Sequence, residues 1–307
     1  MPTKTALITG ATGKQGGATL SALLALRDLP FEKLLALTRN PDSETAKTLA
    51  AKSPSVVSVI RGDLDDPNTI FASAGGHGAV WAVFSVQQVM GGGANWKTEE
   101  RQGKALIDAA VKYGVSHFVY TSVDRSGEHS DENPTDIPHF ASKHRIEQHL
   151  KEAAAASGMT WSILRPVAFF ENLSPDFAGK MFATCWKSHI PPKKRFQLVA
   201  TEDIGHFASQ ALAYPDRWRN RALSLAGDEL TFTEANEIFK SVTGSSAGIP
   251  TTNWIVSWVI LNMVKELRTM FKFFAKEGFN ADIEELRKMY PPLQDFKTWL
   301  RRSVFTK

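Results

Sequence analysis

The chain has 307 residues, of which 43% are hydrophobic and 22% charged, a composition that excludes disorder as the state of the whole chain. A single cysteine, Cys185, excludes a disulfide scaffold and fits a reducing compartment. The formal net charge is +4, an excess too small to indicate direct binding of nucleic acid.

The first half of the chain alternates between strand and helix patterns. Short apolar runs predict strands, and segments with apolar residues at helical spacing predict the helices between them. The predicted strands are 6–9, 34–38, 56–61, 79–86 and 118–121, and the predicted helices are 18–26, 43–52 and 98–113. Apolar strands separated by helices indicate an α/β fold with a doubly wound, Rossmann-type parallel sheet covered on both faces.

The alternation ends near the middle of the chain. Later elements that return to the same sheet are a strand over 160–164, a helix over 203–213 and a strand over 222–226. The remaining segments are rich in helix patterns and aromatic residues. We therefore predict a Rossmann-type cofactor domain of residues 1–165 with 201–226, and a smaller, discontinuous C-terminal substrate or partner lobe of residues 166–200 and 227–307.

The most apolar segment of the second half is 254–264. Its eleven residues are too few to cross a bilayer, which needs about 20. We expect a buried helix here, with a substrate lid or a contact with a membrane surface as the alternatives.

One run of basic residues bears on location. Lys193, Lys194 and Arg195 follow two prolines, and we expect a solvated loop, with a nuclear-import or phosphate-binding patch as the alternative. The first residues form an apolar strand running into glycine and lack the pattern of a signal peptide. We therefore expect a cytoplasmic protein, with the nucleus as an alternative location.

The strongest motif is a glycine loop between the first predicted strand and the first predicted helix. It reads Gly10-Ala11-Thr12-Gly13-Lys14-Gln15-Gly16. Gly10 permits a tight turn, Gly13 lets the backbone approach a pyrophosphate, and Gly16 lets helix and strand pack closely. The helix N-terminus adds N–H groups and the positive end of the helix dipole. The order of strand, loop and helix predicts a dinucleotide site rather than a structural turn.

The end of the second predicted strand bears on the choice of cofactor. An acidic side chain there would bind the ribose 2′-hydroxyl of NAD, but this chain has Arg39. A guanidinium group matches a 2′-phosphate, and Lys14 can approach the same region. The sequence therefore favours NADP(H) over NAD(H), with a solvated loop arginine as the alternative interpretation of Arg39.

The third predicted strand ends before Gly62, Asp63 and Leu64. Asp63 could accept a hydrogen bond from the adenine amino group, and Leu64 could pack on the adenine ring. Asp63 as the cap of the next helix is the alternative.

Several further motifs, taken together, resemble one protein family. They are Thr38-Arg39, Gly62-Asp63-Leu64, residues 117–122 (HFVYTS), 138–143 (PHFASK), Leu164-Arg165-Pro166 with Phe170-Glu171-Asn172, Asp203-Ile204-Gly205 and 225–228 (LAGD). With the glycine loop, they are similar to the NmrA-like family of atypical short-chain dehydrogenases. The resemblance covers about residues 4 to 300, nearly the whole chain.

The resemblance implies a Rossmann-type fold with a small C-terminal lobe, and NADP(H) as the cofactor. Members of the family include regulators that sense the redox state of the cofactor, and related branches are NADPH-dependent reductases. The cofactor contacts that it implies are Gly10, Thr12, Gly13, Lys14, Gln15, Gly16, Arg39, Asp63, Leu64, Ser85, Thr121, Lys143, Pro166, Phe169 and Asn172.

The resemblance also identifies a candidate catalytic pair that departs from the superfamily pattern. The wider superfamily uses a tyrosine as proton donor and a lysine four residues later. Lys143 fits the lysine, but His139 stands at the tyrosine position. The hydroxyl group that normally contacts the substrate falls on Ser122 or Val123, and Tyr120 is expected inside a strand. Histidine can still exchange protons near neutral pH, so both a catalytic and a structural His139 remain open.

Other chemistries have weaker support. His144 and His149 are five residues apart on one predicted helix and do not share a face, so we predict no metal site. Cys185 is expected in buried packing. The aromatic residues Phe169, Phe170, Trp254, Trp258 and Phe274 could form pocket walls or core.

Two functions follow from these patterns. The first is a regulatory NADP(H)-binding protein that lacks the catalytic tyrosine, senses the redox state of the cofactor and passes it on through an interface with a protein partner. The alternative is an NADPH-dependent reductase or isomerase of a small carbonyl or enone compound. We expect a monomer or homodimer, with no nucleic-acid or membrane partner.

Overall fold

The computed structural model describes residues 4–88 and 95–306. The chain divides into two compact units, which we describe separately. The first unit contains the chain up to Ser122, His139–Arg165 and Ile204–Leu223. The second contains Val123–Pro138, Pro166–Asp203 and Ser224–Lys307. The segment Val123–Pro138, which the sequence placed in the cofactor domain, groups with the second unit.

The first unit contains the predicted Rossmann-type sheet, which has seven strands in the order β3-β2-β1-β4-β5-β6-β9. The strands are β1 (Thr5–Ile8), β2 (Lys33–Thr38), β3 (Val57–Arg61), β4 (Ala82–Ser85), β5 (His117–Thr121), β6 (Thr160–Pro166) and β9 (Arg221–Leu225). Each neighbouring pair from β3 to β6 is parallel. The strand order reverses between β1 and β4, and ligands of such sheets bind at this kind of reversal. The predicted fold class is confirmed.

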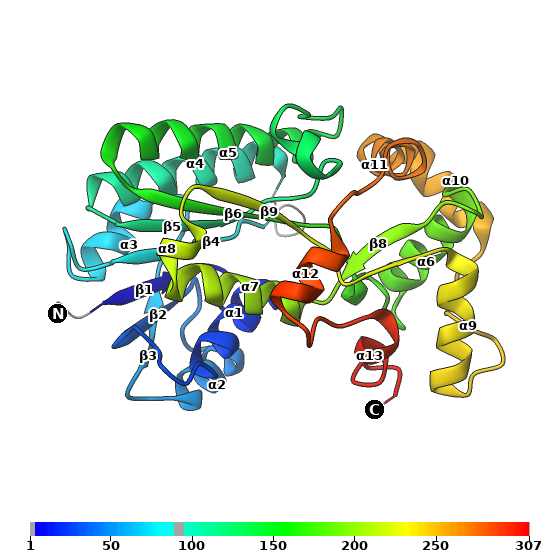
Figure 1. Ribbon diagram of the computed structural model, residues 1–307, viewed down its shortest axis with the longest axis horizontal. Helices are drawn as coiled ribbons and strands as arrows, with labels where there is room; N and C mark the ends of the chain where they lie inside the picture. Colours follow the sequence, from blue (N-terminus) through cyan, green and yellow to red (C-terminus); the bar gives the residue numbers. More distant parts are fainter. Residues whose placement is uncertain (1–3, 89–94, 307) are drawn as a thin grey trace. The chain divides into compact units, whose positions relative to one another are not determined.

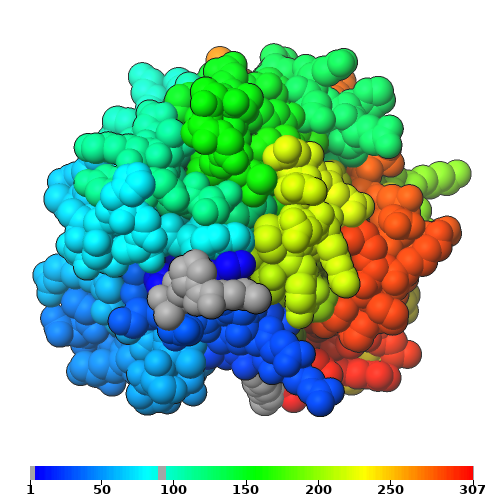
Figure 2. Space-filling view, turned by 60° about the vertical axis from the view of Figure 1, so that its left-hand side comes forward, coloured from blue at the N-terminus to red at the C-terminus, as the bar shows by residue number. Residues whose placement is uncertain are grey.

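Helices cover both faces of this sheet (Figure 1). They are α1 (Lys14–Leu24), α2 (Glu44–Lys52), α3 (Pro67–Ser73), α4 (Trp96–Lys112), α5 (Pro138–Ser157), α7 (Thr201–Ala213) and α8 (Pro215–Trp218). In Figure 1, α4 and α5 lie on the opposite side of the sheet from α1 and α7. In the space-filling view, the blue and cyan segments of the first unit lie side by side on one face (Figure 2). No helix within the described residues is long and apolar enough to cross a membrane.

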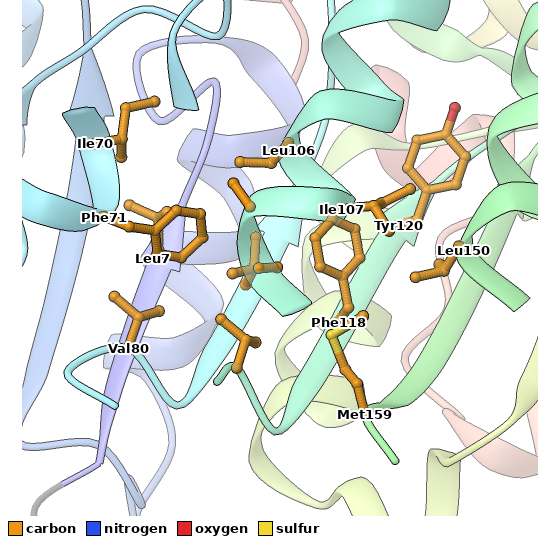
Figure 3. Packing of buried hydrophobic residues seen from close by; sticks show 14 of the residues in the cluster. Leu7, Ile70, Phe71, Val80, Leu106, Ile107, Phe118, Tyr120, Leu150 and Met159 are labelled. Carbon is orange, nitrogen blue, oxygen red and sulfur yellow. The ribbon is translucent and has the colours of Figure 1, made fainter. Parts of the chain in front are cut away.

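The face under α3, α4 and α5 holds the main hydrophobic core of the first unit. Strand residues such as Leu7 and Phe118 pack against Phe71, Leu106 and other helix residues, all fully buried. Figure 3 shows Phe118 and Tyr120 of β5 pointing into this layer. Tyr120 is therefore a core residue, and it lies in a strand as expected.

On the other face, α1 and α7 approach each other very closely. A Cβ atom added at Gly205 of α7 would lie 2.5 Å from the carbonyl carbon of Ala18 in α1. Contacts this short do not occur between real atoms, so the two helices can pack at this distance only because residue 205 is glycine.

The second unit contains a small sheet that the sequence did not predict. Its order is β10-β8-β7, with β7 (Ala168–Phe169), β8 (Phe196–Val199) and β10 (Asp228–Leu230). Helical elements surround it: η1 (Gly127–Asp131), η2 (Phe170–Asn172), α6 (Phe177–His189), α9 (Phe232–Thr243), α10 (Trp254–Met263), α11 (Lys265–Lys276), α12 (Ile283–Met289) and α13 (Phe296–Leu300). Strands of two to four residues are too short to show a period-2 pattern.

Aromatic rings fill the core of the second unit. Phe196 of β8 lies within 5.0–5.7 Å of the rings of Trp186, Phe274 and Phe279. Phe170 contacts Phe296 and Trp299 in the same way. Of the five aromatic residues considered as pocket walls, Phe170 and Phe274 are therefore core residues.

The apolar segment 254–264 is not the buried helix that we expected. It forms α10, in which Trp254 is 64% exposed and Trp258 55% exposed. Only Ser257 and Leu261 of this helix are buried. The expectation of burial was wrong because the segment is apolar on all sides, so its composition does not indicate which side faces the core.

Candidate functional site

The candidate site begins where the strand order of the first unit reverses. Thr9 follows β1, and its hydroxyl accepts a hydrogen bond from the backbone N–H of Val86 (2.8 Å) and donates one to the carbonyl of the same residue (3.1 Å). Gly10 comes next with a φ of +56°, and a Cβ there would lie 2.7 Å from Cγ1 of Val86. Two hydrogen bonds therefore connect the residue after β1 with the residue after β4. At position 10, only glycine fits both the positive φ and the contact with Val86.

The glycine loop leads directly into α1, which begins at Lys14. Gly13 is the N-cap residue, no side chain caps the helix, and its first turn contains no acidic residue. A Cβ at Gly13 would approach one atom, the carbonyl oxygen of Gly10 at 3.2 Å, so the space beside this residue is largely open. Helix N–H groups without a side-chain cap and with open space before them suit an anion such as a pyrophosphate.

Gly16 has a different surrounding. A Cβ at this position would lie 2.3 Å from the carbonyl oxygen of Gly10 and 2.6 Å from that of Thr9. Here α1 packs directly on the backbone that leaves β1. Gly16 thus serves the packing of the loop, whereas Gly13 leaves room for a ligand.

Arg39 and Lys14 are both exposed in the first unit. Arg39 follows β2, and its guanidinium donates a long hydrogen bond of 3.4 Å to Oε1 of Gln88, which follows β4. Arg39 therefore stands at the same edge of the sheet as the glycine loop, with its charge accessible to solvent. This placement suits a phosphate on the ribose of a dinucleotide.

The two residues proposed for the adenine differ in surroundings. The side chain of Asp63 accepts a hydrogen bond from the backbone N–H of Asp65 (3.0 Å) in a local turn. The N-cap residue of α3 is Asp66, so the alternative role of Asp63 as that cap is wrong. Leu64 is half-buried against the hydrophobic core, which leaves part of its side chain available.

Lys143 lies on α5 with its ammonium group held by residues of the first unit. Its Nζ atom is 2.8 Å from Oε1 of Glu99 in α4, and 3.5 Å from the carbonyl oxygen of Thr121. The Glu99 side chain is fully buried, and that of Lys143 is 10% exposed. Ser142 donates a hydrogen bond of 2.5 Å to the other oxygen of Glu99. The positive charge of Lys143 is therefore neutralised by a buried carboxylate.

His139 stands one turn before Lys143 on the same face of α5. It is half-buried, and its ring packs edge-on against Phe140 with centroids 4.7 Å apart. Its backbone carbonyl accepts a hydrogen bond from Ser142 (2.9 Å). The His139 ring thus contacts Phe140, and only its backbone carbonyl is linked to the Glu99–Ser142–Lys143 cluster.

The structure joins two other predicted cofactor residues directly. Thr121, at the end of β5, donates a hydrogen bond of 2.7 Å to Oε1 of Gln15 in α1. Ser85, at the end of β4, accepts one of 2.8 Å from Nε2 of Gln87. Gln87 is only 5% exposed, and its Oε1 atom has no hydrogen-bond partner among the residues that the structure describes. A buried amide oxygen in this state is a group that a ligand's hydroxyl or amide could satisfy.

Two residues of the site, Glu99 and Gln87, were not predicted from the sequence. A signal for Glu99 was present, because it falls on the buried stripe of α4 with Gly103, Leu106 and Ala110. An acidic residue on an apolar stripe predicts a buried partner. No comparable pattern marks Gln87, which lies outside any helix or strand.

Of the remaining predicted cofactor residues, Thr12 is exposed in the glycine loop of the first unit, and the other three belong to the second unit. Pro166 is buried, whereas Phe169 in β7 and Asn172 in η2 are half-buried. The neighbouring Glu171 accepts hydrogen bonds from the backbone and hydroxyl of Thr201 and from the Trp299 indole. Glu171 thus has a structural role within this unit.

Other candidates have ordinary structural surroundings. Cys185 is buried, and burial raises the pKa of its thiol to about 11. In the basic run 193–195, Lys194 donates a hydrogen bond to the backbone carbonyl of Glu277, and Arg195 forms an ion pair with Glu234. Both partners belong to the second unit, as the run itself does. His149 pairs with Asp108 at 2.6 Å. Within the described part of the chain, no three His, Cys, Asp or Glu side chains gather as metal ligands do.

Comparison with known proteins extends these observations. A model described as the NmrA-like family matches residues 2–300 of the chain. The "NmrA-like family domain-containing oxidoreductase hkm9" of Aspergillus hancockii is 28% identical over 270 residues, which cover 83% of this chain and 78% of that protein.

Two solved structures share the fold. The triphenylmethane reductase of Citrobacter sp., complexed with NADP(H), has a TM-score of 0.73 at 19% identity, covering 98% of this chain and 100% of that chain. "Nmra, a negative transcriptional regulator", in complex with NAD, has a TM-score of 0.68 at 17% identity, covering 99% of this chain and 96% of that chain. At these identities the likeness establishes the fold alone.

Proposed function

Because the chain belongs to the NmrA-like family, we propose that it binds NADP(H) and acts as a redox-sensing regulator, signalling the state of the cofactor to a protein partner. The nicotinamide cofactor would supply a hydride when reduced. Two features of the residues that the structure describes support binding: no side chain caps the N-terminus of α1 at Gly13, and the buried Oε1 of Gln87 has no hydrogen-bond partner among them.

Each group of the first unit has a distinct part in binding the dinucleotide. The N–H groups at the start of α1 would hold the pyrophosphate. Arg39 would bind the 2′-phosphate through charge-assisted hydrogen bonds, and Lys14 would add a second positive charge nearby. Lys143 has three N–H donors, one of which reaches the carbonyl oxygen of Thr121. Its ammonium group is also ion-paired with Glu99, in a geometry that does not make a hydrogen bond. A remaining N–H would bind a ribose hydroxyl.

The environment of Lys143 is the observation that carries the regulatory proposal. In the superfamily's usual site the lysine lowers the pKa of a tyrosine, which then exchanges a proton with the substrate. Here the residue at that position is His139, and the lysine charge is compensated by Glu99 at 2.8 Å. A lysine paired in this way exerts little net field on a neighbouring acid. We therefore expect the chain to bind the cofactor without passing a proton to a substrate.

The alternative function is an NADPH-dependent reductase or isomerase of a small carbonyl or enone compound. It is favoured by the shared face of His139 and Lys143 on α5, since an imidazole can donate a proton near neutral pH. The name of the Aspergillus relative, an oxidoreductase, points the same way.

One paired experiment separates the two functions. Calorimetry with NADP⁺, NADPH, NAD⁺ and NADH measures cofactor preference, and a screen for NADPH oxidation over carbonyls and enones measures turnover. The regulatory proposal expects preference for the phosphorylated cofactors and no oxidation above background. Binding with turnover would favour the reductase, and absence of binding would refute both. Analytical ultracentrifugation with each cofactor would separate a monomer from a homodimer.

A further inference from the structure

The second unit presents an apolar helix surface that its own core does not use. Along α10, Trp254, Ile255, Trp258, Val259 and Met263 are between 40% and 79% exposed. At about 100° per residue these five side chains spread over about half of the helix circumference, and the buried Ser257 and Leu261 lie on the other half. We call these five residues the α10 face. Soluble proteins rarely expose a contiguous apolar surface with two tryptophans, and where they do, that surface is typical of an interaction site.

Positive charges stand at both ends of the α10 face. Near its first turn, Lys187 of α6 lines a hollow of about 540 Å³ together with Trp254 and Ile255. Beyond its last turn, α11 begins with Lys265 and carries Arg268, both exposed. Lys272 and Lys276 continue the same exposed stripe of α11.

Acidic side chains are nearly absent from this part of the sequence. Between residues 244 and 276 the sole acidic residue is Glu266, which is half-buried, against four lysines and arginines. The α10 face is therefore an apolar surface in a positively charged surrounding, and its charge complements an anionic one.

From this arrangement we infer that the α10 face binds the surface of a membrane that contains anionic lipids. Tryptophan side chains favour the interface between headgroups and acyl chains, and flanking lysines and arginines are attracted by anionic headgroups. The helix has ten residues and would lie in the interface rather than cross the bilayer. The inference replaces the expectation of no membrane partner, which depended on α10 being buried.

A second copy of the chain fits this surface less well. A symmetric contact through α10 would be isologous, so each end of the face would meet an end of the other copy. Both ends carry lysine or arginine, whichever way the two helices run. Such a contact would bring like charges together, whereas an anionic lipid surface would neutralise them.

Vesicle flotation tests this inference with the full chain. Vesicles of phosphatidylcholine with about 30% phosphatidylserine should bind the protein, and vesicles of phosphatidylcholine alone should bind it much less. W254S/W258S and K265E/R268E should each lower binding to the anionic vesicles by about tenfold or more. The tryptophan emission of the wild type should shift to shorter wavelength on binding.

Matched variants elsewhere in the second unit serve as controls. Phe177 is also an exposed aromatic residue (59%), and Lys297 and Arg301 form another exposed basic pair. F177S and K297E/R301E should bind as the wild type does, with circular dichroism confirming that every variant folds. Absence of wild-type binding, or equal loss in the controls, would overturn the inference. So would a wild-type dimer that W254S/W258S converts to a monomer without any effect of vesicles.

Discussion

The carboxylate of Glu99 lies 2.8 Å from the ammonium nitrogen of Lys143. The pair joins α4 to α5 beside the end of β5, since Lys143 also reaches the carbonyl oxygen of Thr121. Ser142 satisfies the second carboxylate oxygen. Glu99 therefore holds the ammonium group of Lys143 against α4 and compensates its charge.

Replacing Glu99 with glutamine should destabilise the first unit by about 3–5 kcal/mol, because it leaves the Lys143 ammonium buried without a counter-charge. Urea unfolding measures the loss. The double variant E99Q/K143M should recover much of it, because the uncompensated charge is removed as well. Additive losses in the double variant would mean that the two residues stabilise the fold independently.

Arg39→Ala should weaken NADP(H) binding by roughly 1.5–3 kcal/mol, the worth of a charge-assisted hydrogen bond, and leave NAD(H) binding nearly unchanged. Calorimetry with both cofactors measures the difference. Arg219→Ala, another exposed arginine of the first unit, is the matched control and should change neither affinity. Equal losses for the two cofactors would show that Arg39 does not select between them.

Gly13→Val should abolish binding of either cofactor while the protein stays folded. The added side chain would fill the open space before α1, where the pyrophosphate is expected, and it would press on one backbone atom only. Gly16→Val should instead lower the melting temperature, since its side chain would overlap the Gly10 and Thr9 carbonyls. Calorimetry and thermal unfolding of both variants test the contrast. Retained affinity in Gly13→Val would place the cofactor elsewhere.

Position 139 distinguishes a regulator from an enzyme. In a regulator, His139→Ala should keep its cofactor affinity and have no turnover to lose, and His139→Tyr could gain slow reduction of simple carbonyls. In an enzyme that uses the histidine, His139→Ala should lose about 10²–10⁴ in rate, and His139→Tyr should also be slower because the larger phenol crowds the substrate. NADPH oxidation by the wild type and both variants provides the measurement. Wild-type turnover that disappears in His139→Ala would refute the regulatory proposal.

Asp203 should make the second unit less stable as the pH rises through the weakly acidic range. Its carboxylate is 1% exposed and accepts hydrogen bonds from the backbone and side chain of Gln294. Burial outweighs these bonds and raises the pKa of Asp203 to about 6, from a usual value of 3.8. The folded state then binds more protons than the unfolded state between these values, so stability is greatest below pH 3.8 and is lost as the pH rises to about 6.

This contribution of Asp203 amounts to about 3 kcal/mol at most, and other groups add their own pH dependence. Melting temperatures measured from pH 4 to 7 should therefore fall less steeply with rising pH for Asp203→Asn than for the wild type. Identical slopes for the two proteins would contradict the raised pKa.

The sheet and the glycine loop could be predicted because their signals are local. Each strand from β1 to β6 is a short apolar run, and the loop requires glycine at fixed spacing. Boundaries moved by a few residues, as for α1, which begins at Lys14 rather than near residue 18. The first turn of α1 contains the polar residues Lys14 and Gln15, so this turn does not show the apolar periodicity that predicts a helix.

Features that depend on long-range pairing could not be predicted in this way. The Glu99–Lys143 pair joins residues 44 positions apart. The buried stripe of α4 indicates that Glu99 needs a partner, but nothing in the sequence identifies Lys143 as that partner. The sheet β10-β8-β7 is built from strands of two to four residues far apart in the chain. The exposed side of α10 was missed because burial depends on neighbours, and α10 packs against α6 and α11 on one side only.

The close contact between Gly205 and Ala18 limits which residues position 205 can accept as the sequence changes by mutation. An added Cβ at position 205 would overlap the backbone of α1, and no change of rotamer in Ala18 can relieve an overlap with its carbonyl carbon. Position 205 can therefore accept a larger residue only if the whole of α1 shifts, and α1 carries the glycine loop. In a population of random variants selected for folding alone, glycine at 205 should persist as strictly as any residue that touches a ligand.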